Sequence, residues 1–226
     1  MNHTIAEKGR AGFLVPNVAK QSWYFIVGGS LFALGSAASI WGFAGANFTN
    51  WVCFVGAWFF TTAGLFQLVL SGDATKNTGH GKALRAEWLA AATQTFGTLL
   101  FNVSTTSALT AASVDSEKRF VWNPDAGGSV AFLVSAFLVY VAFYRAEATV
   151  WAPTNPGWWA AHINMIGCIA FAFSAVGAFV LDDGTTKDSP LANWGTFIGA
   201  ICFVAASAVA LPGMPWNRGT ANLRRS

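Results

Sequence analysis

Charged residues are scarce in this sequence: only 10% of its 226 residues are Asp, Glu, Lys or Arg, whereas 54% are hydrophobic. Soluble globular domains carry roughly 25% charged residues, so the composition excludes an ordinary soluble domain. Cysteine is scarce too. Cys53, Cys168 and Cys202 lie inside apolar runs without metal-type spacing. We therefore predict small packing residues, with no disulfide framework and no redox motif.

Catalytic motifs are also missing. The sequence contains no Gly-x-Ser-x-Gly, no His-Glu-x-x-His, no P-loop and no paired carboxylates, which leaves an intramembrane enzyme without support. His162 is the one histidine inside an apolar run, and Met165, three residues later, is a poor second axial ligand, so we expect no haem, no metal and no other cofactor. The basic residues are scattered, so the net charge of +3 indicates no nucleic-acid partner.

Long hydrophobic runs are what the sequence does contain. Six of them approach or exceed the length that crosses about 30 Å of hydrocarbon, at residues 23–43, 51–70, 88–109, 130–144, 158–181 and 194–211. The fourth is the shortest and crosses only if residues 126–129 or 145–150 extend it. An alternative for the first run is a cleaved signal peptide, but it is too long for that role. We predict an all-α polytopic membrane protein with a tail at 1–21, one membrane domain at 22–212 and a basic tail at 213–226.

Basic residues predict the orientation in the membrane. Ten of the thirteen Lys and Arg fall on one side, at Lys8, Arg10, Lys20, Lys76, Lys82, Arg85, Arg145, Arg218, Arg224 and Arg225. The opposite side carries most of the acids, in the loops 113–127 and 182–190. Both termini are therefore expected in the cytoplasm of a multi-pass protein of the plasma membrane, with the lipid bilayer as its first partner.

Each of the six runs carries the spacing Gly-x-x-x-Phe. The pairs are Gly28/Phe32, Gly56/Phe60, Gly97/Phe101, Gly128/Phe132, Gly167/Phe171 and Gly199/Phe203. Random placement of 23 Gly and 20 Phe in 226 positions predicts about two such pairs in all. The glycines of alternate runs recur about 70 residues apart, which predicts three repeated helical hairpins at about 22–71, 86–146 and 157–212.

In a helix, this spacing places the glycine and the phenylalanine on one face. Residues at i, i+4, i+7 and i+8 share one face, and the last two positions hold small residues in every run. Such a stripe lets helix backbones approach closely in lipid, where hydrophobic attraction between helices is absent. We predict that each phenylalanine fills the space that a neighbouring glycine leaves.

The segments 26–36, 54–63, 163–177 and 193–206 resemble the YrhK-like domain of bacterial membrane proteins, a two-helix unit with a Gly-Ser-rich first helix and a Phe-x-Gly-Ser type second helix. The resemblance covers the first and third hairpins. The second departs from it at 102–107 and 121–125. The family implies a fold and a membrane location but no functional residues, because it has no assigned activity.

Polar residues inside apolar runs or at their ends are candidate functional groups, since burying them in lipid is costly. The candidates for a polar pathway are Glu87, Gln94, Asn102, Glu147, His162 and Asn164. Glu147 and His162 are candidates for a proton relay. The competing interpretation is that Glu87, Arg145 and Glu147 are solvated at helix ends and that Asn102 joins two helices.

Three functions remain open from the sequence. The leading hypothesis is a non-enzymatic scaffold or accessory subunit that packs with membrane-protein partners or with itself, because the sequence is dense in packing devices and poor in chemistry. The second is a transporter or channel for small solutes or ions; the three-hairpin mitochondrial type is disfavoured because its Pro-x-Asp/Glu-x-x-Lys/Arg signature is absent. The third is a sensor whose acidic external loops bind cations.

Overall fold

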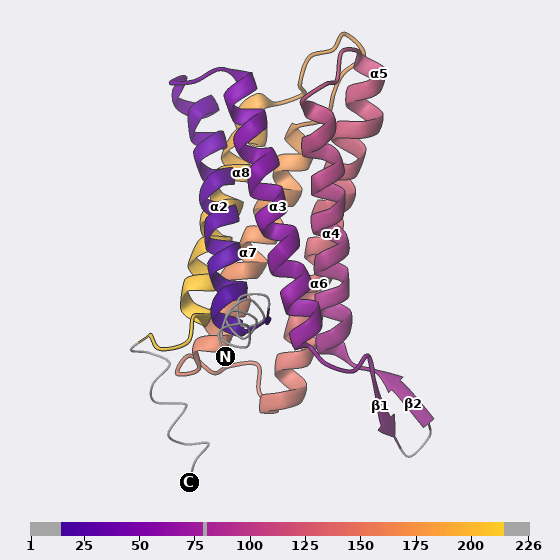
Figure 1. The fold of residues 1–226 in the computed structure, drawn as a ribbon, viewed down its shortest axis with the longest axis vertical. Coiled ribbons are helices and arrows are strands. Elements are labelled where there is room, and N and C mark those ends of the chain that lie inside the picture. The colour runs from indigo at the N-terminus through magenta and orange to yellow at the C-terminus, as the bar shows by residue number, and fades with distance from the viewer. Residues whose placement is uncertain (1–14, 79–80, 215–226) are drawn as a thin grey trace, which may run out of the picture.

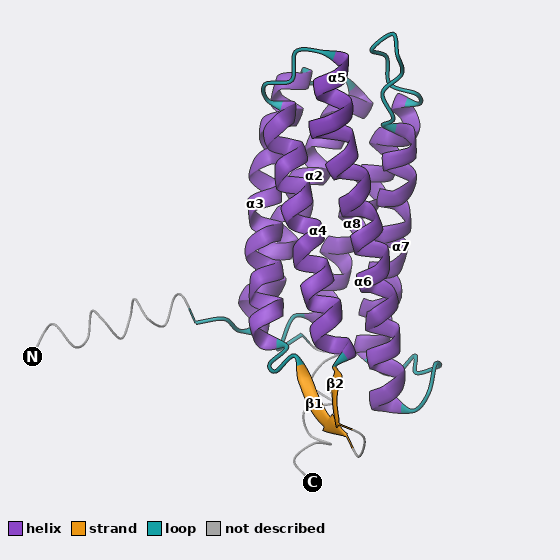
Figure 2. Ribbon diagram, turned by 90° about the vertical axis from the view of Figure 1, so that its right-hand side faces the viewer, coloured by secondary structure: helices purple, strands orange, loops and turns teal. Residues whose placement is uncertain are grey.

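The computed structural model describes residues 15–78 and 81–214. Six long helices lie side by side in one bundle (Figures 1 and 2). They are α2 (Val18–Trp41), α3 (Ala46–Leu70), α4 (Ala86–Ala108), α6 (Asn123–Glu147), α7 (Pro156–Gly177) and α8 (Ser189–Ala210). The connections hold an antiparallel strand pair, β1 (Thr75–Thr78) and β2 (Gly81–Leu84), and two short segments, α5 (Val114–Ser116) and the π-helix η1 (Glu117–Trp122).

The long helices form a closed ring. Each packs against the next in sequence, and α8 packs against α2. The contacts are most extensive within the pairs α2/α3, α4/α6 and α7/α8. The start of α2 and the end of α8 lie at the same end of the bundle as the β1–β2 hairpin, whereas α5 lies at the opposite end (Figure 1). We call these ends the hairpin end and the α5 end.

Five of the helices are long and apolar enough to cross a membrane, and α4 is the long helix that falls short. The reason is its inward face, which buries Gln94, Thr98, Asn102 and other polar residues. The outward face of α4 is apolar, with Phe96, Leu99 and Val103 exposed. The protein therefore has the character of an integral membrane protein, as its composition indicated.

Helix ends differ from the sequence expectation where local capping decides them. The side chain of Asn17 accepts a hydrogen bond from Lys20 N at 2.9 Å, so α2 begins at Val18, inside the segment predicted as a tail. The loop predicted at 113–127 is largely helical, because Ser113 and Ser116 form a capping box that starts α5. The fourth run extends in both directions, and α6 reaches from Asn123 to Glu147.

Candidate functional site

The Gly-x-x-x-Phe residues meet in reciprocal pairs. A Cβ placed on Gly28 would lie 2.8 Å from Cδ1 of Phe60 on α3, and a Cβ on Gly56 would lie 3.0 Å from Cδ2 of Phe32 on α2. The same exchange occurs in the other two helix pairs, where Gly97 faces Phe132, Gly128 faces Phe101, Gly167 faces Phe203 and Gly199 faces Phe171. Glycine fits these positions because a Cβ would crowd the ring of the neighbouring helix, at 2.7–3.0 Å.

The six phenylalanines of this spacing converge on the middle of the bundle. Phe32 stacks on Phe60 with ring centroids 5.2 Å apart, and Phe101 lies 5.0 Å from Phe132. Ring contacts across the helix pairs join these rings to Phe171 and Phe203, so that all six form one cluster. Each ring is at most 4% exposed. The aromatic cluster therefore fills the bundle axis at mid-height.

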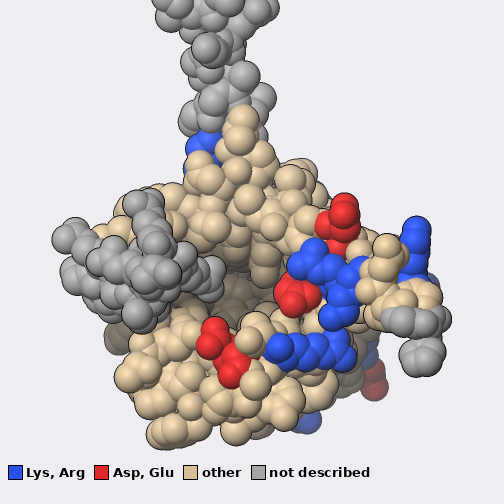
Figure 3. Space-filling view, turned by 90° about the horizontal axis from the view of Figure 1, so that it is seen from below, with Lys and Arg blue, Asp and Glu red and all other residues tan. Residues whose placement is uncertain are grey.

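A cavity of about 190 Å³ lies between this cluster and the hairpin end. Its walls come from all six long helices, with Gln94 as the contribution of α4. Phe203 of the aromatic cluster is among the lining residues, and so is Phe25, whose ring centroid lies 6.4 Å from that of Phe203. Figure 3, viewed from the hairpin end, shows a central hollow with charged residues at its rim. We call this cavity the vestibule.

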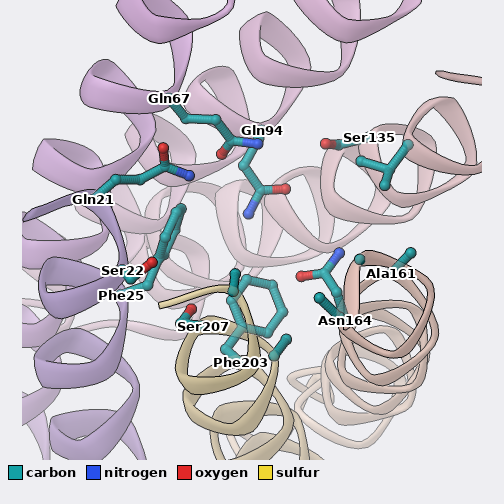
Figure 4. Close-up of a pocket in the computed structure, with 15 residues that line it drawn as sticks. Gln21, Ser22, Phe25, Gln67, Gln94, Ser135, Ala161, Asn164, Phe203 and Ser207 are labelled. Carbon is teal, nitrogen blue, oxygen red and sulfur yellow. The ribbon is translucent and has the colours of Figure 1, made fainter. Parts of the chain in front are cut away.

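The polar wall of the vestibule consists of carboxamides and hydroxyls. Gln21 lies in the first turn of α2 and Gln67 in the last turn of α3, while Gln94 and Asn164 come from α4 and α7. In Figure 4 the carboxamides of Gln21, Gln94 and Asn164 point toward a common space beside the ring of Phe203. The remaining polar lining residues are Ser22, Ser135 and Ser207.

Equivalent positions of the sequence repeat line the vestibule. Phe25, Gln94 and Asn164 each precede the glycine of their run by three residues, and all three contribute to its wall. Gln67, Val139 and Ala210 each follow a glycine by eleven residues and do the same. Each helix pair therefore contributes equivalent positions to the wall of the vestibule, but the residue types at these positions differ.

The six residues predicted to form a polar pathway do not share one site. Gln94 and Asn164 line the vestibule. Glu87 lines an adjoining cavity that shares Gln21 and Gln67 with it, and its carboxylate lies 3.7 Å from Nε of Arg85. Glu147 is exposed at the end of α6 and forms no ion pair with another described residue. Asn102 and His162 lie elsewhere.

His162 belongs to an aromatic pocket of about 130 Å³ between α6 and α7. Its ring lies 3.9 Å from that of Trp158 and 4.9 Å from that of Tyr140. Its Nδ1 lies 2.7 Å from the carbonyl oxygen of Trp158, so this nitrogen carries the proton and donates it. With the ring packed in this way, and no described contact to Glu147, the geometry gives a proton relay between the two no direct path.

Asn102 joins α4 to α3. Its Nδ2 donates to Oγ1 of Thr61, and its Oδ1 is the one buried side-chain polar atom without a partner in the part of the chain that the structure describes. The residue is 7% exposed and does not line the vestibule. This placement fits a contact between helices.

The acidic loops at the α5 end are occupied by local contacts. Lys118 pairs with Asp182, and Arg119 with Asp115 at 2.9 Å. Asp188 caps α8. The hydroxyl and the backbone N–H of Thr185 donate to Asp183, which holds the pKa of Asp183 below its usual value. Within residues 15–78 and 81–214, no three His, Cys, Asp or Glu side chains gather as a metal site would require.

Sequence reasoning missed Gln21, Gln67, Ser22 and Ser207 as lining residues. Gln21 and Gln67 lie near helix ends, where an exposed glutamine is ordinary, and serines are common at helix contacts. The signal that could have found Gln67 is its offset from Gly56, which matches that of Val139 from Gly128 and Ala210 from Gly199.

The chain matches no protein-family model, no curated protein and no solved structure.

Proposed function

We propose that this chain is a six-span membrane protein that binds a small solute in the vestibule and moves it across the bilayer. The observation that carries the proposal is the vestibule itself, a cavity on the bundle axis bordered by all six long helices. Substrate sites of many transporters lie at the interface between structural repeats. The aromatic cluster, which lies between the vestibule and the α5 end, would then separate the two.

Six spans are part of the proposal although α4 is the most polar long helix. The support is its place in the ring between α3 and α6, its 23-residue length and its apolar outward face. At 1.5 Å per residue this length is enough for about 30 Å of hydrocarbon. Three repeated hairpins, a YrhK-like ancestry and cytoplasmic termini remain proposals of the same kind, supported by the recurrent spacing and by the distribution of Lys and Arg.

The test is solute entry into vesicles that contain the purified protein. A panel of small neutral and charged solutes is applied, and vesicle volume is followed by light scattering. We expect at least one solute to enter faster than it enters protein-free vesicles. Phe203→Ala, which removes a ring that belongs to the aromatic cluster and lines the vestibule, should increase entry.

The matched control is Phe173→Ala, because Phe173 is an aromatic residue on α7 that faces outward and is 57% exposed. This variant should transport as the parent does. Entry at the protein-free rate for every solute, with Phe203→Ala included, would disprove the proposal.

The second candidate function is a non-enzymatic scaffold or accessory subunit. It is favoured by the aromatic cluster, which closes the bundle axis with rings that are at most 4% exposed. Purification from the native membrane tests it directly. A stoichiometric membrane-protein partner, together with no solute entry, would favour this function over transport.

A further inference from the structure

The lining of the vestibule is polar but uncharged. Fifteen residues form its wall, and none of them is Asp, Glu, Lys, Arg or His. Four are carboxamides, Gln21, Gln67, Gln94 and Asn164, and three are serines. Glu87 is the nearest carboxylate among the adjoining lining residues, but its side chain is 47% exposed at the rim beside Arg85.

Most of these carboxamides have donors and acceptors that form no hydrogen bond with another described residue. Each carries two N–H donors and an oxygen that accepts. The hydroxyl of Ser135 donates to the carbonyl oxygen of Ala90 at 2.8 Å. The amide of Asn164 makes one weak contact to the sulfur of Cys168 at 3.8 Å. The side chains of Gln21, Gln67 and Gln94 form no hydrogen bond with another described residue.

Gln94 is the decisive residue. It is 4% exposed, yet neither atom of its amide is sealed from the cavity, since the one sealed and unpartnered side-chain atom in the described chain belongs to Asn102. Figure 4 shows its amide directed into the vestibule, opposite that of Asn164. Because a buried amide needs hydrogen-bond partners and Gln94 has none among the described residues, its amide is available to a molecule that occupies the cavity.

We propose that the solute of the vestibule is a small neutral molecule of the amide class, one that both donates and accepts hydrogen bonds, such as urea or acetamide. The proposal rests on the transport function proposed above. Carboxamides match such a solute donor to acceptor, whereas an ion entering this uncharged site would lose hydration without gaining a counter-charge. The volume of about 190 Å³ holds roughly six water molecules at about 30 Å³ each, which suits a solute of a few non-hydrogen atoms.

The experiment compares neutral and charged partners of the same shape. Vesicles with the purified protein receive urea against guanidinium, and acetamide against acetate. The amides should enter faster than into protein-free vesicles, and the ions should not. Gln94→Leu, which keeps the approximate size and removes the amide, should lower amide entry about tenfold, the factor expected for one lost hydrogen bond.

Two variants protect the result against misfolding. Phe96→Leu changes an outward residue of the same helix that is 57% exposed, and it should transport as the parent does. If Gln94→Leu does not elute as a folded species in detergent, Asn164→Leu replaces it, because Asn164 lines the same wall and is only half-buried.

A second readout separates this inference from the transport function. Binding of ¹³C-labelled acetamide and acetate is measured by NMR on the protein in detergent. Entry of guanidinium or acetate without entry of the amides would overturn the solute class and leave transport standing. Acetamide binding that Gln94→Leu abolishes, without entry of any solute, would overturn transport and keep the solute class. If the protein neither binds an amide nor lets one enter, the inference is overturned.

Discussion

Gly127 and Gly128 are neighbours in α6, but they differ in what surrounds them. A Cβ on Gly128 would lie 2.9 Å from two ring atoms of Phe101 and 3.1 Å from the carbonyl oxygen of Gly97, whereas a Cβ on Gly127 would meet only the end of the Leu100 side chain, at 3.2 Å. Overpacking a tight contact costs about 1–3 kcal/mol. Gly128→Ala should therefore lower the free energy of unfolding by that amount.

Gly127→Ala is the matched control for this prediction. Leu100 can shift, and alanine is favoured over glycine inside a helix by roughly 0.5–1 kcal/mol. This variant should be neutral or slightly stabilised. Thermal unfolding of both variants in the same detergent measures the difference, and equal melting temperatures would contradict the packing role of Gly128.

Ala148 is the one residue other than glycine with a left-handed backbone in the part of the chain that the structure describes, at φ = 53°. It ends α6, where its N–H donates to the carbonyl oxygen of Tyr144 at 2.9 Å. A left-handed conformation costs a residue with a Cβ roughly 1–2 kcal/mol. Ala148→Gly should thus raise the free energy of unfolding by about 1 kcal/mol.

Ala146→Gly is the matched control, for which we expect the opposite effect on stability. Ala146 is exposed and lies within α6, two residues before Ala148. The substitution should lower stability by about 1 kcal/mol. Chemical unfolding of the pair reports the sign directly. A destabilised Ala148→Gly would mean that the end of α6 adopts another conformation in the membrane.

At the scale of elements, α4 combines a polar inward face with an apolar outward one. The bond from Asn102 to Thr61 joins it to α3. Bonds of this kind in membranes contribute about 0.6 kcal/mol on average, with a maximum near 1.7. Thr61→Val removes the acceptor and leaves a second polar atom of Asn102 unsatisfied, so we expect a loss of about 1–2 kcal/mol.

Asn102→Leu removes both the bond and the unpartnered Oδ1, so its cost should be smaller than that of Thr61→Val. The double variant should then resemble Asn102→Leu alone. Unfolding measurements on the three variants form a double-mutant cycle. Additive losses would show that the two residues do not interact.

The helices were predictable from sequence to different degrees. Hydrophobic runs locate the elements that cross the bundle, since α3 ends at Leu70 and α4 at Ala108, within a residue of the expected ends. The segments outside the apolar runs were harder to predict. β1 and β2 pair through their backbones and leave their residues largely exposed, and such a hairpin has no hydrophobic periodicity to reveal it.

The same limit applies to the vestibule. Gln94 and Asn164 attract notice because they interrupt apolar runs. Gln21 and Gln67 do not, because they lie near helix ends where polarity is normal. Which polar residues share a cavity depends on the angular position of each helix in the ring, and this follows from packing between helices rather than from any one segment. His162 shows the consequence, because it lies in the second turn of α7 but belongs to a different pocket.

At the scale of the whole molecule, the proposed orientation can be tested with introduced cysteines. Cys53, Cys168 and Cys202 are first replaced by alanine, and then Lys76→Cys in β1 or Thr185→Cys in the α7–α8 connection is added. Both positions are exposed and lie at opposite ends of the bundle. The distribution of Lys and Arg predicts that the hairpin end faces the cytoplasm.

We therefore expect a membrane-impermeant maleimide to label Thr185→Cys in intact cells and Lys76→Cys only after lysis. The protein without cysteine is the control for background. The reverse pattern would mean that the protein has the opposite orientation. Labelling of both sites in intact cells would contradict the proposal of an even number of spans.

The contact between α8 and α2 has a further consequence for how the chain can be connected. Because the ring is closed, each of the six long helices in the described part of the chain has a neighbour on both sides, and no helix pair is the first in the ring. A circular permutant that links the end of α8 to the start of α2 and begins after Leu70 would carry the same contacts in a different chain order. Such a protein should assemble into the same bundle of six long helices.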